Sequence, residues 1–438
     1  MSLTRIFLFL AGGLLLQPAL GLAQTRNIYF GEENRSTWSW DLATGVDSYL
    51  HTYALALEDT SESLAEFMVQ AGFMGRSARK SHHRWRLRTE ASTGTELWRE
   101  RLEGDYSYLD SNRQTRFRLL GNFWGRQYKR STDFVLSSDN FEGRLEARAY
   151  PWVGRTAALD VRAWGGFIDY TTPSTLEVDY QDAGGGVFVR SQSLGNHMWG
   201  GGIRSAQRAY PDSSAIDRHT WSAEVDYDYQ DFEGQSVRVF HKSDRHLIND
   251  ESVRPSAWTH WTDFHGLMGA GSGHVYLEVQ SEVWDYSQES AVYFDSWRLE
   301  TALGYRWGDI LKAVWKVGPV MELMEAGDSP EAYTQLGARA GVESYGSAVG
   351  GSVTLEYGRR QYSQATVEVY EGTGGLDETI YLDLYSDFNY WKIWLLGSWR
   401  ISSKFSLDFL ANYEPENHTE KTDDSAIGFA SLHLVWRP

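Results

Sequence analysis

The strongest constraint on the fold is an alternation of apolar and polar residues with a period of two. In the segment 141–149, odd positions hold Phe, Gly, Leu, Ala and Ala, while even positions hold Glu, Arg, Glu and Arg. The segment 221–230 repeats the alternation without an exception. Successive side chains of a β-strand point to opposite faces, so each segment has one apolar face and one polar face. Helical spacing is not sustained anywhere after residue 23.

Windows with this alternation fill the chain and are long for strands. Most exceed the roughly 5–6 residues usual in soluble sheets and reach the ~9–11 that a tilted strand needs to cross a bilayer. They therefore predict an all-β fold, a transmembrane antiparallel up-and-down β-barrel. The windows lie near 38–50, 65–75, 84–92, 97–108, 115–129, 141–151, 157–169, 177–190, 197–208, 219–230, 235–242, 256–268, 274–287, 293–307, 310–324, 334–345, 348–362, 378–390, 391–401, 405–414 and 425–436.

The strand number follows from parity and from the connections. The windows number 21, whereas single-chain bacterial barrels have an even number of strands. Short and long connections alternate until the segment after 377, so the surplus window lies there. We expect two of the windows in that segment to form one strand, joined either through 389–390 or through 402–403. The prediction is about 20 strands, within a range of roughly 18–22.

The N-terminus has the pattern of a secretory signal peptide. Arg5 precedes an apolar run over 6–16, and the small-residue exit Gly21-Leu22-Ala23 precedes Gln24. The small-residue exit is typical of cleavage after Ala23. The apolar run is shorter than the ~20 residues of a membrane-spanning helix, which argues against an uncleaved membrane anchor. We therefore expect a signal peptide over 1–23, a short periplasmic segment over 24–36 and a barrel over 37–438.

Composition excludes several classes of protein. The chain has no cysteine, which excludes a disulfide scaffold or a thiol enzyme. Its net charge of −18 gives no general basic field for a nucleic acid. The abundance of Trp, Tyr and Phe excludes a disordered chain.

Residues 37–438 resemble bacterial outer-membrane β-barrels of the porin-like class, a resemblance of class rather than of one family. The final window carries Ala430, Leu432, Leu434 and Trp436 on one face, followed by Arg437-Pro438. Barrels of this class end on a strand that the insertion machinery reads. The resemblance implies a bacterial outer-membrane location, contact with lipid and lipopolysaccharide, and insertion by the outer-membrane machinery.

The polar phase of the strands supplies the candidate pore-lining residues. The basic set is Arg116, Arg118, Arg126, Arg144, Arg148 and Arg162, and the acidic set is Glu224, Asp226, Asp228, Glu278, Glu282, Glu356, Asp383 and Asp387. Two interpretations stay open. Either these groups pair with neighbours on adjacent strands, or a basic wall opposes an acidic wall and sets up a transverse field across the pore, as in general porins.

Metal, cofactor and catalytic sites are not predicted. His241 and His246, like His260 and His265, are five residues apart, which places each pair on opposite faces of a strand. Signatures of outer-membrane phospholipase A and of omptin proteases are absent from the sequence, although a Ser/His/Asp set assembled from distant strands stays open. Trp124, Trp164, Trp284 and Trp394 fall on the polar phase, either as lumen packing or as a stacking surface for sugars.

The sequence thus favours a channel for hydrophilic solutes with a cation bias. The alternative is an export or scaffold barrel for an exopolysaccharide or a protein partner. A third hypothesis is a surface-binding protein whose long acidic loops recognise a ligand while the lumen is blocked.

Overall fold

A computed structural model describes the chain over 36–55, 58–78, 80–95, 97–128, 139–171, 178–191, 196–290, 293–309, 311–327, 329, 331–363, 386–419 and 424–437. The expected signal peptide and all but the last residue of the expected 24–36 segment lie outside the described residues. Within those described ranges, no helix is long and apolar enough to cross a membrane.

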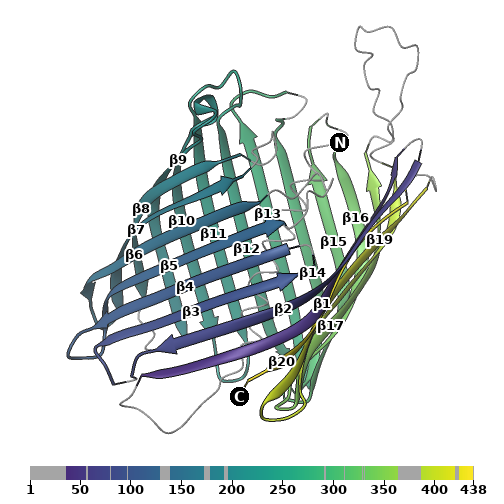
Figure 1. The fold of residues 1–438 in the computed structure, drawn as a ribbon. Coiled ribbons are helices and arrows are strands. Elements are labelled where there is room, and N and C mark those ends of the chain that lie inside the picture. The colour runs from purple at the N-terminus through teal and green to yellow at the C-terminus, as the bar shows by residue number, and fades with distance from the viewer. Residues whose placement is uncertain are drawn as a thin grey trace.

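Twenty antiparallel strands form one closed sheet, in agreement with the predicted fold (Figure 1). Each strand pairs with the next along the chain, and β1 pairs with β20 to close the ring. Closure gives every strand a neighbour on both sides, so the sheet as a whole has no edge strand. The strands are β1 (Thr37–Leu55), β2 (Glu58–Arg76), β3 (His83–Gly94), β4 (Leu97–Leu109), β5 (Thr115–Tyr128), β6 (Asn140–Val153), β7 (Ala157–Tyr170), β8 (Tyr180–Ser191), β9 (His197–Ala209), β10 (Arg218–Gln230), β11 (Ser236–Ile248), β12 (Ala257–Ala270), β13 (Gly273–Tyr286), β14 (Ser296–Asp309), β15 (Ala313–Glu325), β16 (Tyr333–Tyr345), β17 (Val349–Tyr362), β18 (Phe388–Arg400), β19 (Phe405–His418) and β20 (Ser425–Trp436).

The surplus strand falls where parity and alternation placed it. β18 begins at Phe388 and runs without a break through Trp391, so the end of the window 378–390 and the window 391–401 belong to one strand, while 378–385 lies outside the described residues. Its register with β19 is the same on both sides of this point, with Tyr390 opposite Glu416 and Ile393 opposite Tyr413. The joining therefore needs no bulge, and 401–404 remains a turn.

The first hairpin is longer than the alternation predicts. β1 and β2 pair from Thr37 opposite Arg76 to Leu55 opposite Glu58, whereas the windows covered only 38–50 and 65–75. β2 pairs with β3 only from Met68 onward, so its first half is paired with β1 alone. The backbone hydrogen bonds between β1 and β2 continue beyond the residues whose polarity alternates. The windows, which were defined by that alternation, therefore ended before the strands did.

The two faces of the sheet differ in crowding as well as in polarity. Side chains on the concave face converge and are buried, such as Asp160 and Glu356, each 2% exposed. Large apolar side chains on the convex face diverge and stay exposed, such as Ile203 at 62% and Leu336 at 57%. The apolar face thus points outward and the polar face inward, as the period of two predicts.

Connections alternate between the two rims. One rim, here the long-loop rim, carries the segments 56–57, 95–96, 129–139, 171–179, 210–217, 249–256, 287–295, 326–332, 363–387 and 419–424. The other, the short-turn rim, carries 77–82, 110–114, 154–156, 192–196, 231–235, 271–272, 310–312, 346–348, 401–404 and the residues after β20. The predicted alternation holds from β5 onward, and the exceptions are the two-residue connections 56–57 and 95–96 on the long-loop rim.

Candidate functional site: the inner wall of the barrel

The candidate site is the concave wall, which the alternation lines with charged side chains. On β10, Trp221 and Val225 are exposed outward at 54% and 55%, so the even positions between and after them face inward. Residues that lie opposite each other on neighbouring strands point to the same face of the sheet. The predicted basic residues of β5 to β7 therefore share the concave face with the inward-facing residues of the strands beside them.

Four of the six predicted arginines are held by a nearby carboxylate. In each pair the two groups lie on the same strand, on adjacent strands or at a strand end, so they neutralise each other locally. The pairs are Arg116 Nε with Asp110 Oδ2 (2.8 Å), Arg118 Nη2 with Asp105 Oδ2 (2.8 Å), Arg148 Nε with Glu146 Oε1 (2.5 Å) and Arg162 Nη2 with Asp160 Oδ2 (2.7 Å).

The other two arginines lie over aromatic rings. The Arg126 guanidinium carbon is 5.7 Å from the ring centre of Trp124, and that of Arg144 is 6.0 Å from Trp164. Both tryptophans share the inward phase, so here they pack against cations within the lumen wall. This supports lumen packing for these two rings.

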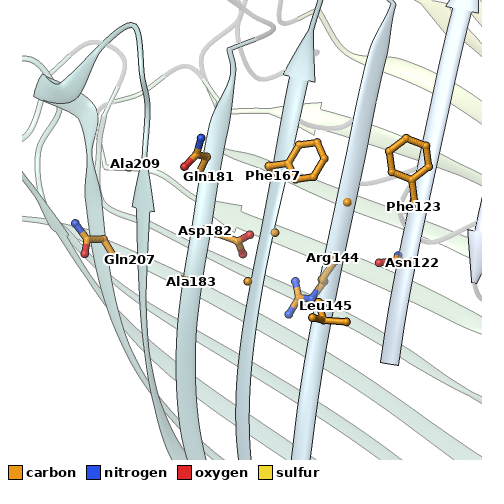
Figure 2. Close-up of a pocket in the computed structure, with 13 residues that line it drawn as sticks. Asn122, Phe123, Arg144, Leu145, Phe167, Gln181, Asp182, Ala183, Gln207 and Ala209 are labelled. Atoms are coloured by element: carbon orange, nitrogen blue, oxygen red, sulfur yellow. The ribbon is translucent and has the colours of Figure 1, made fainter. Parts of the chain in front are cut away.

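Arg144 also borders a hollow in the wall that spans β5 to β9 (Figure 2). Phe123 and Phe167 line it from the outer face, while Arg144 and Asp182 reach it from the inner face. Three of the lining residues, Gly143, Gly165 and Gly166, have no side chain, and the Phe167 ring lies over Gly143. The hollow is therefore a thin part of the wall rather than a pocket with its own set of converging polar groups.

The wall formed by β13 to β18 carries arginines among its carboxylates. Arg339 alone reaches three carboxylates: its Nε lies 2.7 Å from Glu356 Oε2, and its Nη atoms lie 3.4 Å from Glu300 and 3.8 Å from Glu278. The predicted residues Glu356 and Glu278 are thus brought together by an arginine that our sequence reasoning did not select. The sequence places Arg339 on the inward phase of its strand. Its position opposite Glu356 could not be read from the sequence, because it depends on the register between the two strands.

The same wall holds a second group around Glu322, also missed. Glu322 is 4% exposed and accepts hydrogen bonds from Arg298 Nε at 2.6 Å and from the Tyr333 hydroxyl at 2.5 Å. Arg360 approaches its other oxygen at 3.9 Å. A carboxylate this deeply buried persists because cations surround it.

The remaining predicted acidic residues have different surroundings. Glu282 accepts a hydrogen bond from the Trp284 indole nitrogen at 2.7 Å, on the inner face of β13. Asp387 lies just before β18 at the long-loop rim, where it accepts the Tyr362 backbone N–H at 2.9 Å and contacts Arg359 at 3.3 Å. Asp383 lies outside the described residues.

The strand β10 carries acidic side chains on its inner face, with glycines opposite two of them on β9 and the cations Lys242 and Arg238 opposite two of them on β11. Glu224, Asp226 and Asp228 follow one another on its inner face, and within the described part of the chain none of the three makes an ion pair. Gly200 and Gly202 of β9 lie directly opposite Asp226 and Glu224, so no side chain covers them from that side. We call these three residues the β10 carboxylates.

Ion pairs with neighbours hold seven of the thirteen predicted charged residues that the structure describes, which agrees with the first of the two interpretations for those seven. The basic wall carries its own carboxylates, and the wall facing it carries its own arginines. A transverse field between a wholly basic wall and a wholly acidic wall does not follow from this arrangement. The part played by the individual residues in selectivity stays a prediction.

The two histidines of β11 lie on different faces of the sheet. His241 and His246 contact Thr262 and Thr220 on opposite faces of β11, as the five-residue spacing predicts. Among the residues that the structure describes, no group of three or more His, Asp or Glu side chains is arranged to hold a metal ion.

One set does resemble a catalytic triad in composition. The hydroxyl of Ser386 lies 2.5 Å from His418 Nδ1, and His418 Nε2 lies 3.5 Å from Glu416. Ser386 and His418 are only 7% and 9% exposed, so the hydroxyl is covered where a nucleophile needs access to its substrate. We interpret the set as a buried polar contact that ties β19 to the segment before β18.

These features define the class: a closed barrel with an apolar outer surface and a charged inner wall, the architecture of a transmembrane β-barrel. Comparison with solved structures finds the same fold. The copper transporter OprC aligns with 92% of this chain and 81% of its own, at 10% identity and a TM-score of 0.54. The siderophore receptor PirA from Pseudomonas aeruginosa aligns over the same shares, at 10% identity and a TM-score of 0.50.

A third structure aligns over nearly its whole length but less closely. The outer membrane protein opdK from Pseudomonas aeruginosa covers 92% of this chain and 99% of its own, at 9% identity and a TM-score of 0.42. No protein-family model matches the sequence, and no curated protein matches it. The likeness therefore concerns the fold.

Proposed function

We propose that the protein is a channel of the bacterial outer membrane that conducts hydrophilic solutes through the barrel. The observation that carries this proposal is the closed ring of twenty strands with charged side chains on its inner wall. Barrels above about 16 strands enclose an aqueous lumen unless a plug fills it. The outer surface meets lipid and lipopolysaccharide, and the outer-membrane insertion machinery assembles the barrel. The proposal needs no cofactor and no catalytic residue.

A preference for cations is the second part of the proposal. The segments of the long-loop rim contain 22 Asp and Glu and 4 Lys and Arg, a net charge of −18. The β10 carboxylates add unpaired negative charge inside the barrel. A mouth and lumen of one sign raise the local concentration of counter-ions, so cations enter more readily than anions.

Reconstitution in a planar lipid bilayer tests both parts. We expect discrete openings and a reversal potential of the sign that indicates cation preference in a salt gradient. The triple variant Glu224→Gln, Asp226→Asn, Asp228→Asn keeps the openings and reduces that potential, because it removes three lumen carboxylates that make no ion pair within the described residues. The matched control removes three carboxylates from the outward phase, Glu100→Gln, Asp169→Asn and Glu325→Gln, and leaves the potential unchanged.

The outcomes separate the competing functions. Absence of discrete openings in the folded protein would contradict the channel. Loss of small-solute uptake on gene deletion supports it, whereas loss of polysaccharide secretion with normal uptake favours the export or scaffold barrel. Equal shifts in the two triple variants would overturn the role of the β10 carboxylates and leave the channel intact.

A further inference from the structure

The outer wall of β9 to β12 is polar at the level where the rest of the barrel is apolar. These four strands lie side by side (Figure 1). Their outward phase is marked by exposed Trp221, Ile203 and Trp258. The polar residues on that phase, here named the polar outer patch, are Ser205, Gln207, His219, His241, Ser243, Arg245, His260 and Thr262.

Contacts across the ladders confirm that these side chains share one face. His219 Nε2 lies 3.0 Å from the Ser205 hydroxyl, and His241 Nδ1 lies 2.9 Å from the Thr262 hydroxyl. Three further contacts extend the patch, two between β11 and β12 and one along β12. The rings of His241 and His260 stack at 6.0 Å, those of Trp258 and His260 stack at 6.2 Å, and Arg245 lies 5.2 Å above Trp258.

The patch reaches the middle of the strands. His241 follows the start of β11 by five residues and precedes its end by seven, so it lies near the centre of the strand. Corresponding outward positions on other walls are apolar, as with Leu299 and Leu303 on β14 or Ile393 and Leu395 on β18. The His241 imidazole at that depth would face hydrocarbon, and Arg245 lies on the same face nearer the long-loop rim.

Hydrocarbon supplies no hydrogen-bond partner to these groups. Polar and charged side chains on the lipid face of a barrel are destabilising, most of all near the midplane. A neutral imidazole has one donor and one acceptor nitrogen, and the contacts with Ser205 and Thr262 each engage only one ring nitrogen. A protein surface in place of lipid removes this penalty.

We propose that the polar outer patch is an interface with a second copy of this chain. Besides Arg245, the adjoining outward surface carries one carboxylate, Asp285, which lies opposite Trp258 on β13. Within the described residues neither Arg245 nor Asp285 makes an ion pair. A two-fold axis along the membrane normal, passing near Trp258 and His260, brings each Arg245 towards Asp285 of the other copy.

Self-complementarity favours a second copy over a different partner. A two-fold interface presents the same patch from both sides, so each donor must find its acceptor in an identical surface. Histidine, serine, threonine and glutamine carry both donors and acceptors, and Arg245 and Asp285 carry opposite charges. The inference is independent of the proposed channel function.

Cysteine cross-linking in membranes tests it, since the chain has no cysteine of its own. Ser243→Cys lies opposite His260 and near the proposed axis. We expect oxidation to link this variant into a dimer. The matched control is Ala430→Cys, on the outward face of β20 across the barrel, for which we expect at least tenfold less dimer. Heat-modifiable migration on a gel shows that both variants are folded.

A charge exchange gives the second measurement. In the Ser243→Cys background, Arg245→Asp is expected to lower the dimer yield at least fivefold, and adding Asp285→Arg is expected to restore it. Equal yields from Ser243→Cys and Ala430→Cys would overturn the proposal, as would cross-links to a different protein. Lipopolysaccharide that protects the introduced thiol of Ser243→Cys from a water-soluble thiol reagent, without any dimer, would also overturn it.

Discussion

Individual side chains on the inner wall are held mainly by charge pairs that each depend on register. Arg339 and Glu356 lie directly opposite each other on β16 and β17, and Glu322 lies opposite Gln335 with its cations one or two strands away. Removing one partner from such a buried group leaves a charge without compensation, which costs more than the pair itself contributes. The groups around Glu322 and Arg339 therefore stiffen one side of the barrel.

Replacing Glu322 by Gln tests this at the residue scale. We expect Glu322→Gln to lower the free energy of unfolding by about 3–5 kcal/mol, because Arg298 loses its nearest buried carboxylate while the volume is unchanged. Urea-induced unfolding in lipid vesicles measures it. Glu300→Gln is the control, since Glu300 is about one-third exposed and its loss is expected to cost less than about 1 kcal/mol. Equal losses of unfolding free energy in Glu322→Gln and Glu300→Gln would contradict a larger contribution from the buried Glu322.

Two turns of the short-turn rim are built alike. Asp110 Oδ1 accepts the backbone N–H groups of Asn112 and Gln114, and Asp231 Oδ1 accepts those of Glu233 and Gln235. The backbone hydrogen bond from Gln114, with the nearby Arg116, lowers the pKa of Asp110. The residue before each glutamine has a positive φ, 63° at Arg113 and 82° at Gly234.

Gly234 is the residue in these turns whose replacement is most informative. We expect Gly234→Ala to destabilise the barrel by about 1–2 kcal/mol, because a Cβ is disfavoured at this φ. Gly104→Ala is the matched control: Gly104 lies within β4, and a Cβ added there would meet only open space, so alanine is expected to be neutral or stabilising by up to about 1 kcal/mol. Thermal unfolding in detergent separates them, and a neutral Gly234→Ala would show that the turn is not strained.

Charge is distributed along the axis of the whole molecule rather than between two walls. The long-loop rim carries −18, while the segments of the short-turn rim and the residues after β20 contain 7 Lys and Arg and 3 Asp and Glu, a net charge of +4. The inner wall between them is largely self-paired. The field of the molecule therefore changes sign from one rim to the other.

This axial field predicts a salt dependence of selectivity. Screening shortens the Debye length from about 10 Å at 0.1 M to about 3 Å at 1 M, so the contribution of the exposed rim fades with salt while that of the lumen persists. We expect cation preference to fall as salt rises. In the triple variant of the β10 carboxylates it should nearly vanish at 1 M yet remain at 0.1 M. Reversal potentials at both concentrations measure this, and a preference independent of salt would exclude a role for the rim.

Much of the architecture was predictable because a period of two fixes which face of the sheet each side chain points to. The alternation assigns each side chain of β10 to a face without knowledge of its neighbours, and an even strand number located the surplus window before β18. The long first hairpin was not predictable, since hydrogen bonds between β1 and β2 extend past the residues whose polarity alternates.

The sequence by itself determined the strands and the face on which each side chain lies, because these depend only on residues adjacent in the chain, and the length and number of the strands predicted the closed antiparallel barrel. Tertiary structure decided which charges meet: Arg339 finds Glu300 and Glu356, and His241 stacks on His260. A one-residue slip between neighbouring strands would change every such partner. Lateral register is a property of the assembled sheet, so the paired walls and the polar outer patch emerge only when the ring closes.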